Sequence, residues 1–397
     1  MTPISLPQGF RYAGFCAGIK PSGKKDIAII VTDHPAVAVG VYTQNVVRAC
    51  SIDWNRKITP TDKIRGLVIN SGNANACTGE LGVTHNFQMA KKLADMTSVA
   101  PEQVAILSTG VIGHPLPIEK VMVGIETAWE HLGDSHDDFM AAANAILTTD
   151  NGPKTATKQF AVDGNTLRVA AMAKGAGMIG PNMATMLAVI TTDARIDPDT
   201  AQALIRRVAD RSFNNISVEG HTSTNDGLIM IASGRAQQRP LVGSFLKIFE
   251  DELTDVAIEL AKKIPADGEG ATHLVSISVH GADSDQTARI IAESIANSAL
   301  VKTAIYGGDP NWGRIVSAAG YCGVELDPSQ MSLEINGFTL FRNGQPIPFE
   351  AANVSQSMKE NFETSLKLNI GQGTGQCEHW TSDLTVDYVK FNSEYTT

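Results

Sequence analysis

Short apolar runs rich in valine and isoleucine alternate along the chain with longer segments in which apolar residues recur every three or four positions. Glycine, proline, asparagine or aspartate bounds most of the short runs, which is typical of β-strands. The predicted strands are 27–32, 36–42, 66–70, 167–173, 187–192, 228–233, 274–280, 365–370 and 384–390.

Helical spacing is clear after Asp197, a predicted N-cap that is followed by Pro198 at the first helical position. Residues 249–264 form another apolar stripe, which Pro265 should end. Further predicted helices are 85–95, 118–131, 136–147 and 285–299. Because strands and helices are mixed throughout, the pattern predicts an α/β or α+β fold. The 397 residues are enough for two or three domain-sized units.

Composition and charge narrow the class of protein. The net charge of −10 would repel a phosphate backbone, and 6% aromatic residues offer few surfaces for base stacking, so we expect no nucleic-acid partner. No apolar run is long enough to cross a membrane, and the first residues do not resemble a signal peptide, which predicts a cytoplasmic protein. The cysteines are few and lack metal-site spacing, so we expect neither disulfides nor a zinc site: Cys16, Cys50, Cys77, Cys322 and Cys377.

The segment KGAGMIGPNMATMLAVITTD at 174–193 contains the formal dinucleotide fingerprint Gly175-x-Gly177-x-x-Gly180. That motif binds a pyrophosphate only where a helix begins at the glycines and directs its amides at the phosphate. Here the residues that follow Pro181 favour a strand instead. A nicotinamide oxidoreductase is therefore a weakly supported alternative.

The same segment places Ala184-Thr185 between a glycine-rich loop and a predicted strand, an arrangement that suits an N-terminal nucleophile. A threonine hydroxyl needs a nearby base. If the Ala184–Thr185 bond is cut, the new α-amino group, with a pKa of about 8, supplies that base. The hydroxyl can make the cut itself by attacking the Ala184 carbonyl, which gives an ester that water releases. An ordinary strand threonine is the alternative.

Two polar loops are candidates to support such a nucleophile. The sequence STGVIG at 108–113 offers a hydroxyl beside a flexible backbone N–H, as an oxyanion hole requires. The sequence NSGNANACTG at 70–79 follows a predicted strand and could orient a substrate or only cap a helix.

Taken together, the motifs resemble the family of ornithine acetyltransferases, also called glutamate N-acetyltransferases. The resemblance covers nearly the whole chain. Its motifs are the segment 174–193, NSGNANACTG at 70–79, STGVIG at 108–113, LTTD at 147–150, SFNNISVEGHTSTND at 212–226, ADGEGATH at 266–273, KTAIYGGDPNWGRIVSAAGY at 302–321 and FNSEYTT at 391–397.

The resemblance implies a precursor that cuts itself before Thr185 into an α chain, 1–184, and a β chain, 185–397, which stay together. It implies transfer of acetyl from N2-acetylornithine to L-glutamate by a ping-pong route through acetyl-Thr185, as in the cyclic pathway of arginine biosynthesis. Acetyl-CoA is a further donor if the enzyme is bifunctional. The implied fold is a layered, DmpA-like α/β arrangement with central β-sheets, and the implied assembly is an α2β2 heterotetramer. No metal or cofactor is implied.

The resemblance also implies roles for particular residues. Thr185 is the nucleophile, and Thr109 and Gly110 form the oxyanion hole. The implied substrate-binding set is Thr148, Lys174, Thr185, Glu269, Asn392 and Thr397. A lysine suits a substrate carboxylate, and Glu269 could pair with an amino group of ornithine. Asn392 and Thr397 can take part only if the end of the chain folds back over the site.

Three positions depart from the expected family pattern: Asn151 and Pro310 stand where threonine and alanine are expected, and His221 replaces an acidic residue. These departures leave the cleavage chemistry unchanged but affect the expected donor and acceptor preference. An amidase or aminopeptidase-type hydrolase on the same scaffold is an alternative, because water can also resolve an acyl-enzyme. A non-catalytic binding module is the least supported alternative.

Overall fold

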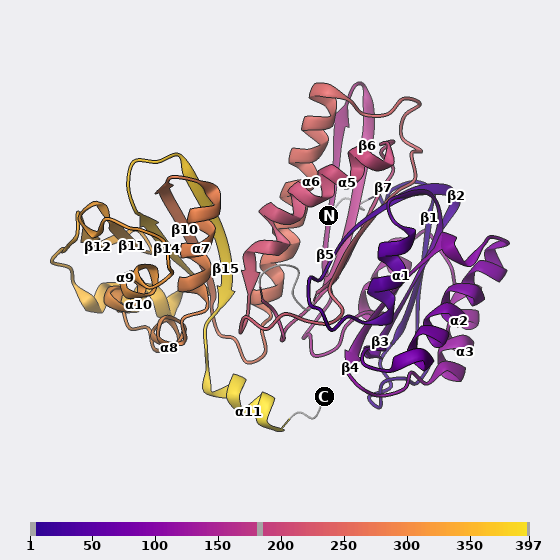
Figure 1. Cartoon of the computed structure of the whole chain (residues 1–397), viewed down its shortest axis with the longest axis horizontal. Coiled ribbons are helices and arrows are strands. Elements are labelled where there is room, and N and C mark those ends of the chain that lie inside the picture. The colour runs from indigo at the N-terminus through magenta and orange to yellow at the C-terminus, as the bar shows by residue number, and fades with distance from the viewer. Residues whose placement is uncertain (1–4, 181–185, 395–397) are drawn as a thin grey trace.

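The computed structural model describes residues 5–180 and 186–394. These residues form two α/β lobes, each built on its own β-sheet (Figure 1). We call them the first lobe, whose sheet contains β1–β7 and β9, and the second lobe, whose sheet contains β8 and β10–β15. The prediction of a layered α/β fold with central β-sheets is confirmed.

The sheet of the first lobe has the order β4-β3-β2-β9-β7-β6-β5, with β1 paired to β2. The pairs β3–β4 and β7–β9 are parallel, and the other pairs are antiparallel. The two predicted strands 27–32 and 36–42 form the single strand β2. The bounds are β1 Phe10–Phe15, β2 Ile27–Tyr42, β3 Thr61–Asn73, β4 Val104–Val111, β5 Lys154–Val162, β6 Asn165–Lys174, β7 Leu187–Thr192 and β9 Gly227–Ala232.

Helices cover both faces of this sheet, because consecutive residues of its central strands β7 and β9 are buried. In β7, Val189 belongs to one buried cluster and Ile190 to the cluster on the opposite face. Period-two alternation of side chains sends neighbours to opposite faces, so a strand that is apolar throughout must be covered twice. The covering helices are α1 Cys50–Ile58, α2 Gly79–Thr97, α3 Ile118–Glu130, α4 His136–Ala145, α5 Pro198–Arg211 and α6 Gly243–Ala266.

The sheet of the second lobe has the order β13-β12-β11-β14-β10-β15-β8. Strand β14 alternates exposed and buried positions along its whole length, so only one of its faces is packed. Its strands are β8 Ile216–Ser217, β10 Leu274–Ala282, β11 Ser332–Ile335, β12 Phe338–Arg342, β13 Gln345–Pro346, β14 Glu363–Asn369 and β15 Gly375–Ser382. Its helices are α7 Asp285–Ala296, α8 Ala299–Gly307, α9 Trp312–Gly320 and α10 Ala351–Glu360. Short 3-10 turns cover Pro101–Gln103, Phe213–Asn215 and Pro328–Gln330.

The predicted strand 384–390 is wrong, because this segment begins the helix α11, Val386–Glu394. The alternation of leucine, valine and tyrosine suggested a strand, but β15 ends at Ser382, before the segment starts. The Thr385 hydroxyl accepts the Tyr388 amide at 3.0 Å, which satisfies a first-turn amide and favours a helix. The predicted helix 285–299 is α7, which ends at Ala296, and the next helix, α8, begins at Ala299.

Within the described ranges, none of the helices combines the length and the apolar composition that a membrane span needs.

Candidate active site

The candidate oxyanion-hole residues lie at the carboxyl end of β4, beside the parallel end of β3. Thr109 is paired with Ser71, and Gly110 with Gly72. Gly110 has a φ of +132°, and a Cβ at this position would overlap the Gly72 backbone. Only glycine therefore allows the two strand ends to approach so closely.

Asn225 joins this edge of the sheet to the loop that follows β3. Its side-chain amide donates to the carbonyl of Ala74 at 2.7 Å and to the carbonyl of Ser108 at 2.8 Å. The side-chain oxygen of Asn225, Oδ1, accepts a hydrogen bond from the Thr224 hydroxyl at 2.6 Å. The loop 223–226 is thereby fixed against the end of β4.

A cavity of about 190 Å³ lies against this edge. It brings together six of the predicted site residues: Thr109, Gly110, Thr148, Lys174, Glu269 and Asn392. The other residues that line it are Ile112, Thr149, Gly177, Met178, Ser223, Thr224 and Asn225. Segments far apart in the chain thus converge on one pocket, as the resemblance implied.

A buried charge cluster forms one wall of the pocket. Lys174, the last residue of β6, has its Nζ 3.9 Å from Asp150, and Lys154 Nζ lies 2.6 Å from the same carboxylate. Asp150 also accepts the backbone amides of Gly175 at 2.6 Å and Thr148 at 3.0 Å. Burial would raise the pKa of Asp150, but the two ammonium groups hold that pKa below its ordinary value. The carboxylate therefore stays ionised and fixes Thr148 beside Lys174.

Lys174 is itself almost completely buried. Burial lowers the pKa of its ammonium group, and the attraction of Asp150 opposes that shift. A ligand carboxylate beside Lys174 would favour the ammonium form, and at a buried, poorly hydrated position that attraction is stronger than in water.

Glu269 and Asn392 also line the pocket. The Glu269 amide donates to the Ala176 carbonyl at 2.8 Å, and its carboxylate packs against Gly177, where a Cβ would overlap it. Asn392, on α11, donates to Glu269 Oε2 at 3.1 Å. The end of the chain does fold back over the site as far as Asn392. Thr397 lies outside the described residues.

The glycines of the apparent dinucleotide motif serve close packing within the protein. Gly175 donates to Asp150, Gly177 makes room for Glu269, and a Cβ at Gly180 would meet the backbone of Gly220 at 2.5 Å. The next described element after these glycines is the strand β7. This packing accounts for the motif without a dinucleotide.

The predicted nucleophile, Thr185, and its neighbour Ala184 lie outside the described residues, but both flanks are anchored at the pocket. On one side, the Ile179 carbonyl accepts the amides of Val218 and Gly220, each at 2.9 Å. On the other side, the Met186 amide donates to Asp226 at 2.9 Å. Burial raises the pKa of Asp226 well above its ordinary value, and hydrogen bonds and Lys174 only partly offset this.

Glu219 lies between Val218 and Gly220, whose amides bind the Ile179 carbonyl, at the place where the two lobes meet. Burial raises the pKa of its carboxyl to about 7; the negative charge of Glu269 adds to the shift, and Lys302 opposes it. Burial lowers the pKa of Lys302 to about 7. Sequence reasoning missed both residues as site neighbours, although both lie within motifs that carry the resemblance.

The structure places the three departures from the family pattern differently. Asn151 donates its backbone and side-chain amides to Asp267 at 3.1 and 2.7 Å, close to the Glu269 loop. His221 is exposed, and the Pro310 carbonyl accepts the amide of Trp312 at 2.9 Å. Sequence reasoning gave no role to Ser223, Thr224 and Asn225, although the polar run HTSTND was a signal for them.

Among the described residues, no group of three or more histidine, cysteine or acidic side chains is arranged to hold a metal ion. The titratable residues that line the pocket are Lys174, which is buried, and Glu269. Such a pair suits a small ligand that carries both a carboxylate and an amino group.

Comparison with known proteins agrees with this geometry. The ArgJ family model matches residues 11–397. The arginine biosynthesis bifunctional protein ArgJ of Rhodopirellula baltica is 51% identical over 398 residues, covering 99% of this chain and 96% of the relative. The protein of the same name from Gloeobacter violaceus is 43% identical over 398 residues, covering 99% of this chain and 98% of the relative.

A solved structure is also similar. The crystal structure of the arginine biosynthesis bifunctional protein ArgJ from Bacillus halodurans is 38% identical, with a TM-score of 0.51. The match covers 98% of that solved chain but 52% of this one. On the family model and on relatives matched along nearly their whole length, the chain belongs to the ArgJ family.

Proposed function

We propose that this chain is an acyltransferase of arginine biosynthesis that moves an acetyl group from N2-acetylornithine to L-glutamate through an acetyl-Thr185 intermediate. The observation that carries the proposal is the single pocket that joins Thr109 and Gly110 to Lys174, Glu269 and Asn392. The names of the family relatives place those relatives in arginine biosynthesis.

In the first half-reaction, the Thr185 hydroxyl attacks the acetyl carbonyl of the donor. The C–O bond forms, the amide C–N bond breaks, and ornithine leaves with the proton of the hydroxyl, which the α-amino group of Thr185 carries. In the second half-reaction, the amine of glutamate attacks the ester, so that N-acetylglutamate leaves and the hydroxyl is restored. We assign Thr109 and Gly110 to stabilising the negative oxygen in both steps.

Both substrates present a carboxylate, and the donor also presents a cationic side chain. Lys174 and Glu269 both line the pocket, together with Thr148 and Asn392. We assign Lys174 to the substrate carboxylate and Glu269 to the amino group of ornithine. Thr397 completes the proposed substrate-binding set. We assign no metal or cofactor to these steps.

The proposal includes self-cleavage between Ala184 and Thr185 into the α chain, 1–184, and the β chain, 185–397. Two observations support it. The solved relative from Bacillus halodurans is matched over nearly its full length by about half of this chain, as expected for one of two polypeptides. In addition, β7 and β9 of the proposed β chain pair with β6 and β2 of the α chain, so one sheet would hold the two chains together.

We extend the proposal to acetyl-CoA as a second donor, because the relatives are called bifunctional. We also propose that two αβ units assemble as an α2β2 heterotetramer and act in the cytoplasm.

The test compares the wild type with Thr185→Ala and with Thr166→Ala, a matched control at an exposed position of β6. We expect two polypeptides and acetyl transfer from acetylornithine to glutamate in the wild type and in Thr166→Ala. We expect one uncut, inactive chain for Thr185→Ala, and slow cleavage for Thr185→Ser. A full-length single chain that transfers acetyl would contradict the mechanism, and free acetate without glutamate dependence would show a hydrolase instead.

A further inference from the structure

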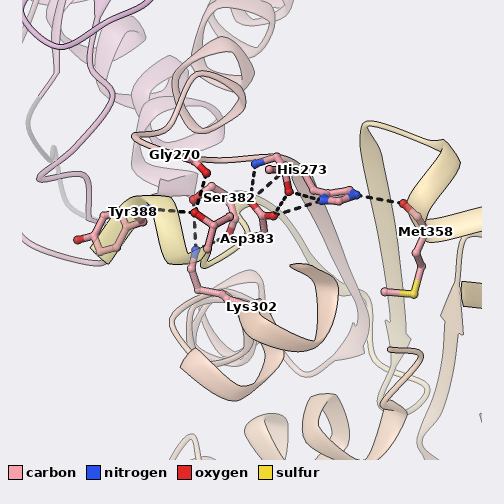
Figure 2. A network of polar contacts seen from close by, with 9 residues as sticks. Gly270, His273, Lys302, Met358, Ser382, Asp383 and Tyr388 are labelled. Carbon is pink, nitrogen blue, oxygen red and sulfur yellow. Dashed lines mark hydrogen bonds and ion pairs between the residues drawn. The ribbon is translucent and has the colours of Figure 1, made fainter. Parts of the chain in front are cut away.

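The segment that links β15 to α11 is held from two sides by buried polar groups (Figure 2). On one side, Asp383 accepts the backbone amides of Thr272 at 2.9 Å and His273 at 3.2 Å. It also accepts the Thr272 hydroxyl at 2.5 Å and pairs with His273 Nδ1 at 3.2 Å. A single carboxylate thereby fixes the loop 268–273 through several donors.

On the other side, Lys302 of α8 holds the end of β15, directly before this segment. Its Nζ donates to the Ser382 carbonyl and to the Thr381 hydroxyl, the latter at 2.9 Å. The far side of the His273 ring reaches the Met358 carbonyl of α10 at 3.2 Å. The segment and the loop are thus tied to two helices of the second lobe.

Two of the residues that line the pocket, Glu269 and Asn392, lie on segments that meet at this junction. Glu269 lies in the fixed loop, and Asn392 lies on α11, which begins directly after the fixed segment. The Thr385 hydroxyl donates to the Gly270 carbonyl at 2.7 Å, and a Cβ at Gly270 would meet the Tyr388 amide at 2.5 Å. The helix therefore packs directly on the loop that carries Glu269.

We propose that Asp383 is a positioning residue of the candidate active site, which holds the loop 268–273 against the start of α11 and so sets where Glu269 and Asn392 stand at the pocket. Asp383 acts through these two residues and is not itself among the residues that line the pocket. The proposal deepens the proposed function, on which its kinetic test rests.

The charge state of the junction is consistent with this role. Burial would raise the pKa of Asp383, but hydrogen bonds from His273 and Thr272 hold that pKa below its ordinary value. The hydrogen bond with Asp383 raises the pKa of His273. The carboxylate therefore keeps its acceptor capacity over the pH range in which the enzyme is assayed.

The first test is Asp383→Asn, which keeps the size of the side chain and removes its charge. Losing charged hydrogen bonds at one end of the loop should raise KM for acetylornithine by about 10-fold and change kcat by less than about threefold. His273→Gln, which leaves the carboxylate in place, should raise KM less. The matched control is Glu250→Gln, because Glu250 is a mostly buried carboxylate paired with Arg207 and away from the pocket. This control should leave KM unchanged.

A double-mutant cycle separates positioning from general destabilisation. If Asp383 acts through the contact of Asn392 with Glu269, the effect of Asp383→Asn on KM should fall below about threefold in an Asn392→Ala background. Full additivity of the two changes, or an unchanged KM in folded Asp383→Asn, would overturn the proposal.

Hydrogen exchange gives an outcome that does not depend on the reaction. Asp383→Asn should speed exchange of amides in both the loop 268–273 and α11, whereas Glu250→Gln should not. Unchanged exchange in these segments would overturn the positioning role even if the wild type transfers no acetyl group. Absence of transfer in the wild type would count against the proposed function alone.

Discussion

The sheets of the two lobes are built from different kinds of strand. In the first lobe, β7 and β9 are buried at every position, and helices lie on both faces. In the second lobe, β14 alternates exposed and buried positions, and Ser276 of β10 bonds Glu363 on the open face. The doubly covered sheet supplies the strand ends that carry Thr109, Gly110 and Lys174, whereas Glu269 lies on the loop between α6 and β10 and Asn392 on the terminal helix α11.

This difference suggests that the two groups of pocket residues have different roles. A sheet packed on both faces resists local displacement, which suits groups that must stay fixed around a reacting carbonyl. A loop and a terminal helix held by a few polar contacts can adjust more readily. The proposed oxyanion hole therefore lies on a sheet that is packed on both faces, whereas Glu269 and Asn392 lie on a loop and a terminal helix that depend on polar contacts.

The largest expected effect on acetyl transfer comes from a substitution at Gly110, at the carboxyl end of β4. Gly110→Ala should reduce acetyl transfer by about 100-fold or more, because the added Cβ meets the Gly72 backbone and displaces an oxyanion donor. The measurement is kcat/KM for acetylornithine with folding checked by circular dichroism. Gly320→Ala in the second lobe, where a Cβ meets no neighbour, is the control. Activity of Gly110→Ala within a few fold of the wild type would remove this glycine from the proposed site.

Core substitutions test directly whether each sheet is packed on one face or on both. The side chains of Val189 and Ile190 point to opposite faces of β7. Val189→Ala and Ile190→Ala should each lower the free energy of unfolding by about 1–4 kcal/mol. In β14, Leu366→Ala should cost a similar amount, whereas Ser365→Ala on the open face should change stability by less than about 0.5 kcal/mol. Chemical denaturation measures all four. Equal costs at Leu366 and Ser365 would show that the second sheet is also packed on both faces.

The junction between the lobes should show a pH-dependent stability. The pKa of Glu219 rises from its ordinary 4.5 to about 7, so between these values the folded state holds a proton that the unfolded chain has released. Stability is therefore lost as pH rises through this window. Glu219→Gln should be more stable than the wild type by about 2–3 kcal/mol at pH 8, with no difference at pH 4.

Thermal unfolding across this pH range measures the effect. Glu250→Gln is the control of opposite sign, because its bond to Arg207 lowers the pKa of Glu250, and losing it should destabilise the protein above pH 5. A Glu219→Gln variant whose stability follows the wild-type pH curve would contradict the burial of this carboxyl.

The sequence predicted many of the apolar elements. Strands such as 187–192 were predictable because their burial on both faces requires valine, isoleucine and leucine at consecutive positions. The helix after Asp197 was predictable from Pro198 at its first position. The pocket residues were predicted from motifs along the chain, and the structure brings Thr109, Lys174 and Asn392 to one cavity.

Other features depend on contacts that no local pattern contains. Helix α11 looks like a strand in sequence, and its hydrogen bond from Thr385 to Gly270 exists only once the second lobe has formed. The roles of Asn225 and Asp383 depend on carbonyls and amides that lie more than a hundred positions away in the chain. Such polar junctions are set by tertiary structure, and composition gives no sign of them.

In the proposed mechanism, Thr185 becomes a free chain end and carries the acetyl group. The most direct measurement is mass spectrometry of active protein that has been incubated with acetylornithine and quenched before glutamate is added. We predict two polypeptides, one of which begins Thr-Met-Leu-Ala and carries one acetyl group on its N-terminal residue. Addition of glutamate should remove that acetyl group. An acetyl-transferring protein whose fragments never begin at Thr185, or never carry the acetyl group, would contradict the account.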